Sequence, residues 1–168
     1  MSLRATQRPI KELYRGEPDA ARITLRAEGR SENDPMACSV DIGRAIYASQ
    51  AHAGVGGAGT AACSGDLLLG ALAACAQVTC QMVAASMEIP VREVHVSVEG
   101  TLDLRGTLGI SDEVPVGFES IRTTFTIDAP EATPEQIDAL KEKTERYCVV
   151  MQTLLTPASM ESAWNAEM

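Results

Sequence analysis

Five cysteines are the side chains of this 168-residue chain most capable of redox or nucleophilic chemistry. They are Cys38, Cys63, Cys75, Cys80 and Cys148, an odd number without a CxxC pair or a regular disulfide framework. A thiolate reacts with peroxides to give a sulfenic acid, and a neighbouring thiol then condenses with it into a disulfide. In a reducing compartment such cysteines are buried thiols or redox-active ones, because structural disulfides do not persist there.

Metal and phosphate chemistry find little support in the sequence. The only two histidines are His52 and His95, so a zinc site would have to be assembled from scattered residues, and we expect neither a metal nor a cofactor. The glycine-rich segment 52–59, HAGVGGAG, contains no lysine and matches neither of the usual phosphate-binding patterns. We interpret it as a loop whose backbone another group can approach closely.

Composition and charge argue against two classes of binding partner, nucleic acids and membranes. The net charge of −9 and the aromatic content of 4% argue against nucleic-acid binding, which needs basic patches or stacking rings. Residues 1–20 are charged throughout and lack the apolar core of a secretory signal. The longest mainly apolar stretch, residues 67–83, is interrupted by polar residues and falls short of a membrane span. We therefore expect a cytoplasmic protein without nucleic-acid or membrane partners, and a neutral or apolar small substrate is compatible with its charge.

Hydrophobic periodicity predicts the elements that must position the cysteines. We expect residues 1–20 to form an arm or a short helix and residues 21–168 to form a single domain. Alternation of apolar and polar residues predicts strands at residues 21–30, 37–40, 45–47, 91–104 and 118–128. Together with the two helices described next, this order predicts an α+β fold.

The central helix is the strongest prediction. Ser64 is expected to be its N-cap, and Asp66 lies in its first turn, near the positive end of the helix dipole. Residues 67–87 contain no proline, are rich in Ala, Leu and Met, and are followed by Pro90, which marks the end of the helix. The helix is apolar on nearly all sides, which predicts a buried, central position.

The second helix begins with a capping box, in which Thr133 is the N-cap and Gln136 the third helical residue. Cys148 lies at its far end, whereas Cys75 lies in the middle of the central helix among small residues that permit a close approach to its sulfur. Two helices that both contact the core could bring these cysteines within disulfide reach, about 7 Å between Cα atoms. Residue types alone favour the simpler interpretation, that both are buried thiols.

Two motifs resemble those of the OsmC/Ohr family. Residues 56–60 (GGAGT), 64–69 (SGDLLL) and 71–75 (ALAAC) resemble its glycine-rich loop and the central helix that carries the reactive cysteine. Residues 146–150 (RYCVV) resemble its second motif, in which a cysteine ends the second helix. The motifs occur in the expected order with a β-hairpin between them, and the resemblance extends from about residue 21 to the C-terminus.

This resemblance implies a fold and a chemistry. It implies antiparallel sheets packed around a buried central helix, in an intertwined homodimer with two active sites at the interface. It also implies that Cys75 attacks an organic hydroperoxide and becomes a sulfenic acid, that Cys148 resolves it as a disulfide, and that an external dithiol or a lipoylated protein reduces that disulfide. In the family an arginine from the N-terminal sheet stabilises the thiolate. Arg30 is the best match here, and Arg26 is the second choice.

One residue departs from the family pattern. The acidic residue that orients the arginine is replaced by Gly65, so that either the adjacent Asp66 takes its role or Asp66 is only a helix N-terminal charge. The departure favours an alternative, a non-catalytic OsmC-like stress-response or small-ligand-binding protein. A third hypothesis, a cysteine-dependent hydrolase or transferase with His52 as its base, has no supporting motif.

The remaining cysteines have simpler explanations. Cys63 precedes the central helix and either senses oxidants or packs. Cys80 follows Cys75 by five residues and therefore faces another direction on the helix. Cys38 is expected to be a core strand residue, and His95 to face solvent opposite the valines of its strand.

Overall fold

The computed structural model describes residues 3–17, 22, 28–31, 37–41 and 45–166, with the backbone alone for residues 3–6, 10, 12, 28–31 and 37–41. The predicted strand residues 23–27, which include Arg26, lie outside the described residues, as do residues 32–36. The arm or short helix expected in residues 1–20 is the helix α1 (Leu3–Gly16).

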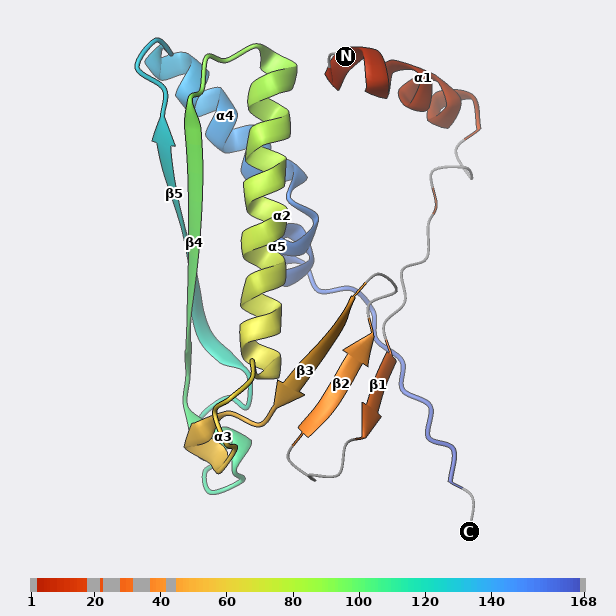
Figure 1. Cartoon of the computed structure of the whole chain (residues 1–168), viewed down its shortest axis with the longest axis vertical. Coiled ribbons are helices and arrows are strands. Elements are labelled where there is room, and N and C mark those ends of the chain that lie inside the picture. Colours follow the sequence, from red (N-terminus) through yellow and green to blue (C-terminus); the bar gives the residue numbers. More distant parts are fainter. Residues whose placement is uncertain (1–2, 18–21, 23–27, 32–36, 42–44, 167–168) are drawn as a thin grey trace.

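The chain combines a three-stranded sheet, a long hairpin and a set of helices (Figure 1). The antiparallel sheet has the order β1-β2-β3 and consists of β1 (Glu28–Ser31), β2 (Ala37–Asp41) and β3 (Ile46–Gln50). The hairpin consists of β4 (Glu93–Leu102) and β5 (Phe118–Asp128). The helices are α2 (Ser64–Met87), the single turn α3 (Leu104–Thr107), α4 (Pro134–Tyr147) and α5 (Val149–Leu155). This is the predicted α+β arrangement, with strand bounds that differ from the expected ones by a few residues.

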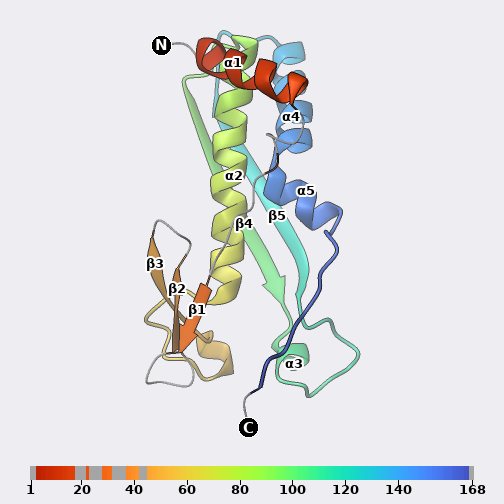
Figure 2. The same cartoon turned by 90° about the vertical axis from the view of Figure 1, so that its right-hand side faces the viewer.

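The hairpin and α2 form the body of the molecule. Along β4 the valines 94, 96 and 98 turn toward α2, whereas His95 and its alternate neighbours face solvent, as predicted. The Gln77 side chain of α2 donates a hydrogen bond to the Val94 carbonyl oxygen at 2.7 Å, which fixes the helix along the strand. The helices α4 and α5 cover another side of α2 (Figure 2). The helix α2 contacts α1, β4, α4 and α5.

The start of α2 differs by one residue from the prediction. Cys63, not Ser64, has the extended backbone of an N-cap, and Ser64 is the first helical residue. The Asp66 carboxylate accepts a hydrogen bond of 2.9 Å from the Cys63 backbone N–H, half of a capping box. The helix ends at Met87, because Glu88 takes a left-handed conformation with φ of 56°.

Burial of α2 is confined to one stripe. Its fully buried residues recur every fourth position, at Leu72, Ala76, Cys80 and Ala84. Other apolar side chains of the helix are exposed, including Val78 at 53%, so within one chain α2 is not buried on all sides as expected. By length and mean hydropathy α2 is also long enough to span a membrane, contrary to the expectation for residues 67–83, although core helices of globular proteins meet the same criterion.

The second helix begins as predicted but ends differently. Thr133 and Gln136 form the capping box through two reciprocal hydrogen bonds of 3.3 and 2.9 Å. The helix then breaks at Cys148, whose backbone is extended, and α5 follows at once. The sequence does not predict α5 as a separate helix. Residues 157–166 then form an extended tail without regular secondary structure.

The glycine-rich segment is an ordered turn in front of α2. It contains a 3₁₀ turn (Ala53–Val55) that His52 caps by accepting a hydrogen bond of 3.0 Å from the Gly54 N–H. Gly57 passes so close to the Ala51 carbonyl that a Cβ atom there would collide with its oxygen. The close approach expected of this loop is therefore made by the chain's own backbone.

We expect the substitution Gly57→Ala to lower the free energy of unfolding by about 3 kcal/mol, because the loop must move to admit one methyl group. The matched control is Gly117→Ala, where a Cβ atom meets no heavy atom within 4 Å and where we expect little change. Urea denaturation at one protein concentration measures both. Equal stability of the two variants would show that the loop yields to the methyl group at little cost.

Candidate active site

Cys75 and Cys148 lie in contact in one buried cluster. Cys148 packs against Leu72 and Ala76 of α2, and Cys75 borders the same cluster. Both are free thiols. Their exposure differs, since Cys148 is 0% exposed whereas Cys75 is partly accessible. The structure thus brings together the two cysteines that the sequence singled out.

The break between α4 and α5 places Cys148 in this buried cluster. Its N–H donates to the Thr144 carbonyl oxygen at 3.0 Å and its own carbonyl accepts from the Gln152 N–H at 2.9 Å, so one residue ends one helix and starts the next. The Gln152 side chain also donates a hydrogen bond of 2.9 Å to the Glu145 carbonyl oxygen, across the corner. The first N–H groups of α5 have no partner within their own helix and are left to face the sulfur atoms.

The surroundings of Cys75 favour its thiolate. Burial opposes ionisation, but the Val150 N–H, the Cys148 thiol, the Thr79 hydroxyl and the Val149 N–H outweigh it and lower the pKa of Cys75 below its ordinary value. The Thr79 oxygen lies 4.0 Å from the Cys75 sulfur, one turn along α2. All the groups that lower this pKa are neutral hydrogen-bond donors.

The surroundings of Cys148 have the opposite effect. Burial raises the pKa of its thiol, and the adjacent Cys75 sulfur raises it further, while the N–H groups of Met151 and Val150 offset only part of this. Cys148 therefore keeps its proton over a pH range in which Cys75 loses one, and its thiol donates toward the Cys75 sulfur. Two thiols in contact thus have pKa values shifted in opposite directions.

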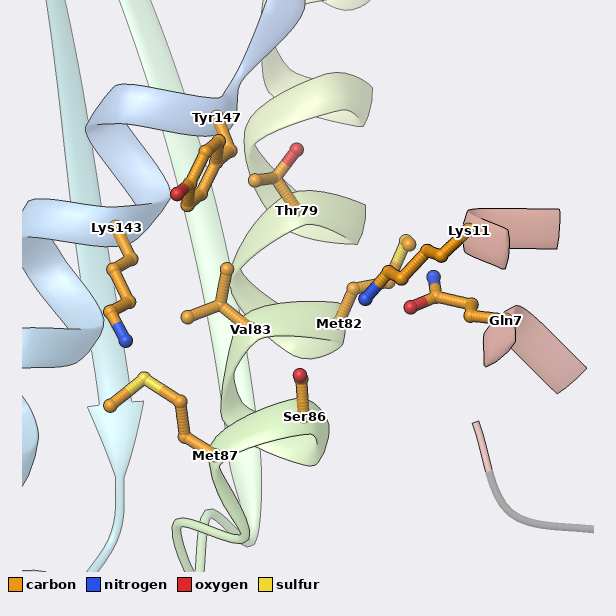
Figure 3. Close-up of a pocket in the computed structure, with 9 residues that line it drawn as sticks. All are labelled: Gln7, Lys11, Thr79, Met82, Val83, Ser86, Met87, Lys143 and Tyr147. Carbon is orange, nitrogen blue, oxygen red and sulfur yellow. The ribbon is translucent and has the colours of Figure 1, made fainter. Parts of the chain in front are cut away.

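A cavity of about 550 Å³ begins beside Thr79. It lies between α1, α2 and α4 and has an apolar floor formed by Met82, Val83 and Met87 (Figure 3). Lys143 reaches it from α4 and Lys11 from α1, on opposite sides of α2, while Tyr147 lies at the same end as Thr79. None of the described residues that line it is acidic, although the chain carries a net charge of −9.

The other cysteines and the histidines lie outside this pair. Cys80 is buried on another part of α2 against Leu140, so it faces away from Cys75 as predicted. Cys63 is partly buried at the start of α2, and only the backbone of Cys38 is described, in β2. His52 belongs to the glycine-rich turn, where it lies close enough to the Asp66 carboxylate to lower its pKa slightly. Among the described residues, no group of three or more His, Cys, Asp or Glu side chains could hold a metal ion.

The arginine expected at the site is not placed beside Cys75 by the described part of one chain. Arg30 lies in β1, paired with Ser39 of β2, and β1 is the strand of its sheet farthest from α2 in Figure 1. Its side chain and all of Arg26 lie outside the described residues. Asp66 is engaged as a helix cap: the Cys63 N–H is the main cause that lowers the pKa of this exposed carboxylate.

The space around Gly65 explains in part why no acidic side chain occupies this position. A Cβ atom there would lie 3.3 Å from the Phe118 ring, which would have to give way slightly, and in ordinary contact with the Cys63 sulfur at 3.5 Å. The sequence reasoning also missed Thr79 and the N–H groups of α5. Thr79 could have been found, since a hydroxyl four residues after a helical cysteine lies on the same face.

Comparison with known proteins identifies the family and the fold of this chain. The family description of OsmC-like proteins matches residues 57–162, while a comparison with functionally curated proteins finds no match. An OsmC-like protein from Mycoplasma pneumoniae superposes with a TM-score of 0.66 at 15% identity, over 80% of this chain and 89% of that one. An organic hydroperoxide resistance protein from Legionella pneumophila gives 0.62 at 19% identity, over 81% and 92%. The protein OhrB of Bacillus subtilis gives 0.51 at 18%, over 80% and 93%. At these identities the structures establish the fold alone, and together with the sequence match they show that this chain belongs to the OsmC-like protein family.

Proposed function

We propose that this protein is a thiol-dependent peroxidase that reduces organic hydroperoxides. The Cys75 thiolate attacks the terminal oxygen of the hydroperoxide, the O–O bond breaks, and the departing alkoxide takes a proton to leave as an alcohol. Cys75 is then a sulfenic acid. The Cys148 sulfur attacks it, forms the Cys75–Cys148 disulfide and releases water. An external dithiol, or a lipoylated protein, restores both thiols by exchange.

The opposite pKa shifts of two cysteines in contact are the observation that carries this proposal. A peroxidatic cysteine must be a thiolate with access to the substrate, and Cys75 has both the lowered pKa and the partial exposure. A resolving cysteine must remain reduced until a sulfenic acid forms, and burial protects the Cys148 thiol. Because the two sulfurs already interact, resolution requires little movement of α5.

The cavity beside Thr79 supports an organic substrate in preference to hydrogen peroxide. Its floor of two methionines and a valine suits the alkyl part of an alkyl or lipid hydroperoxide. Lys11 and Lys143 make this end of an acidic molecule locally positive, so a substrate with a carboxylate is accommodated as well. The reaction requires a compartment that supplies dithiol reductants, and we place it in the cytoplasm.

We further propose that the active unit is a homodimer. One face of α2, which includes Ala74 and Val78, is apolar and exposed in a single chain. The tail leaves Met160 and Trp164 more than 90% exposed, an arrangement that a monomer in water disfavours. A second copy would cover these surfaces and could bring its N-terminal sheet, with Arg30, to the Cys75 of the first.

One observation favours a second candidate, a non-catalytic binding protein with the same fold. Gly65 offers no carboxylate and Asp66 serves as a helix cap, so the family's means of orienting an arginine is missing among the described residues. In that case the redox pair would persist but react with peroxides no faster than an ordinary thiol. A thiol titration separates the two candidates.

Stoichiometric cumene hydroperoxide added to the reduced protein is expected to consume two thiols per chain rapidly. Cys75→Ser should lose no thiol, so that its remaining Cys148 stays reduced, and Cys148→Ser should accumulate a sulfenic acid that a dimedone-type reagent traps. Cys63→Ser, which removes a partly buried thiol outside the pair, should react like the wild type. Loss of wild-type thiols no faster than those of free cysteine would exclude the peroxidase and leave the binding protein.

Removal of the Thr79 hydroxyl is expected to raise the pKa of Cys75, because a donor to the thiolate is lost. In Thr79→Val, iodoacetamide should therefore alkylate Cys75 roughly two- to fivefold more slowly at pH values below that pKa, which corresponds to the loss of about 0.5–1 kcal/mol of thiolate stabilisation. Well above that pKa the rate should equal that of the wild type. Thr79→Ser, which keeps the hydroxyl, is the matched control. Iodoacetamide labelling of the Cys75 peptide across pH, followed by mass spectrometry, measures the shift. A pH profile of Thr79→Val that overlies the wild type would remove Thr79 from the site.

Light scattering during size-exclusion chromatography is expected to give a molar mass twice the chain mass of 17.8 kDa. Val78→Glu places a charge on the exposed face of α2 and should shift the protein toward single chains. Val116→Glu introduces the same charge at a residue that is 68% exposed in the connection before β5, and should leave the mass unchanged. A wild-type protein with the mass of one chain would contradict the homodimer.

A further inference from the structure

A second pocket lies on the other side of the redox pair, between β5, α4 and α2. It has a volume of about 420 Å³ and differs from the cavity of Figure 3 in all its lining residues. Its walls are mainly apolar and include Phe125, Ile137 and Leu140. Its lining residues come from α2, β5, α4 and α5, and Figure 2 shows α4 and α5 beside α2.

One polar group inside this pocket is left without a partner. Thr144 of α4 is 2% exposed, and its hydroxyl forms no hydrogen bond with any residue in the described part of the chain. A helical threonine commonly donates its hydroxyl to the carbonyl one turn earlier, which Thr144 does not do. A buried hydroxyl without a partner is costly, so native structures satisfy such groups with protein, water or ligand.

The Cys80 thiol lies beside the Thr144 hydroxyl but does not form a hydrogen bond with it. Burial raises the pKa of Cys80, and the adjacent Thr144 hydroxyl lowers it only in part. Their approach does not have the geometry of a hydrogen bond, and a thiol is a weak donor and acceptor in any case. The hydroxyl therefore retains its capacity to donate to a stronger acceptor in the pocket.

The charge at the mouth of the pocket is balanced. Lys141 and Glu145 lie one helical turn apart on α4, and both are exposed to solvent. Their opposite charges favour neither an anion nor a cation, in contrast to the two lysines of the first cavity. The pocket is mainly apolar, and of its three threonines, Thr123, Thr124 and Thr144, only Thr144 has a buried hydroxyl without a partner.

We propose that this pocket binds a small neutral molecule with an apolar body and one hydroxyl or carbonyl oxygen, which accepts a hydrogen bond from Thr144. The volume lies within the range of pockets that enclose small organic ligands. The pocket shares Met151 with the packing around Cys148, and the Thr144 carbonyl accepts the Cys148 N–H. The ligand thus lies directly behind the resolving cysteine, although its binding does not depend on the peroxidase proposal.

The test uses the full-length reduced protein and two probes of similar shape, benzyl alcohol and toluene. Cys80 lines the pocket, so the rate at which methyl methanethiosulfonate transfers its methylthio group to Cys80, with methanesulfinate as the leaving group, reports occupancy. Benzyl alcohol is expected to slow this reaction in a saturable way, with at least tenfold weaker binding in Thr144→Val and near wild-type binding in Thr144→Ser. Toluene should bind the wild type and Thr144→Val equally.

Matched controls keep the result specific. Thr126→Val removes a hydroxyl from the exposed face of β5 and should leave benzyl alcohol binding unchanged. Thr79→Val alters the first cavity and should leave it unchanged as well. Absence of protection by benzyl alcohol, or equal affinity in the wild type and Thr144→Val, would overturn the proposal and leave Thr144 satisfied by water alone.

Discussion

The packing of the α4–α5 corner against α2 is the constraint on which the candidate site depends. Cys148 is both the last cap of α4 and the first cap of α5, and it is fully buried against Leu72 and Ala76. A continuous helix through this position would use the N–H groups of Val149 and Val150 internally. Because the chain turns there, these groups are free to lower the pKa of Cys75, and the corner that buries one sulfur favours the thiolate form of the other.

This arrangement stabilises a thiolate with neutral donors. The groups that outweigh burial at Cys75 are two backbone N–H groups, a thiol and the Thr79 hydroxyl, none of which carries a charge. Neutral donors fixed by helix geometry need no reorganisation when the sulfur changes charge. In the proposed peroxidase, these donors would make Cys75 less dependent on an oriented arginine, and so on an acidic residue at position 65. An arginine from a second chain would add to these donors and need not replace them.

Much of the fold could be read from the sequence, and the reasons differ by element. The hairpin followed from strict alternation in β5, and the start of α4 from the capping box of Thr133 and Gln136. The pairing of Cys75 with Cys148 followed only from family resemblance, because no local rule predicts contacts between residues so far apart. The helix α5 was missed since residues 148–155 continue the apolar pattern of α4, and the break at Cys148 arises from tertiary packing. Burial of α2 was overestimated because an all-apolar helix does not reveal whether its own chain or another covers it.

The position of Cys75 on α2 explains both its partial burial and its access to the donors of α5. Leu72 and Ala76 belong to the stripe that packs within the chain, whereas Ala74 and Val78 belong to the exposed apolar face. Cys75 lies on the border between the two and is therefore only partly buried. A thiol deep in the stripe, such as Cys80, has its pKa raised by burial, and a thiol on the open face would lack the donors of α5. Only at this border can one sulfur be close to Cys148, surrounded by donors and still partly exposed.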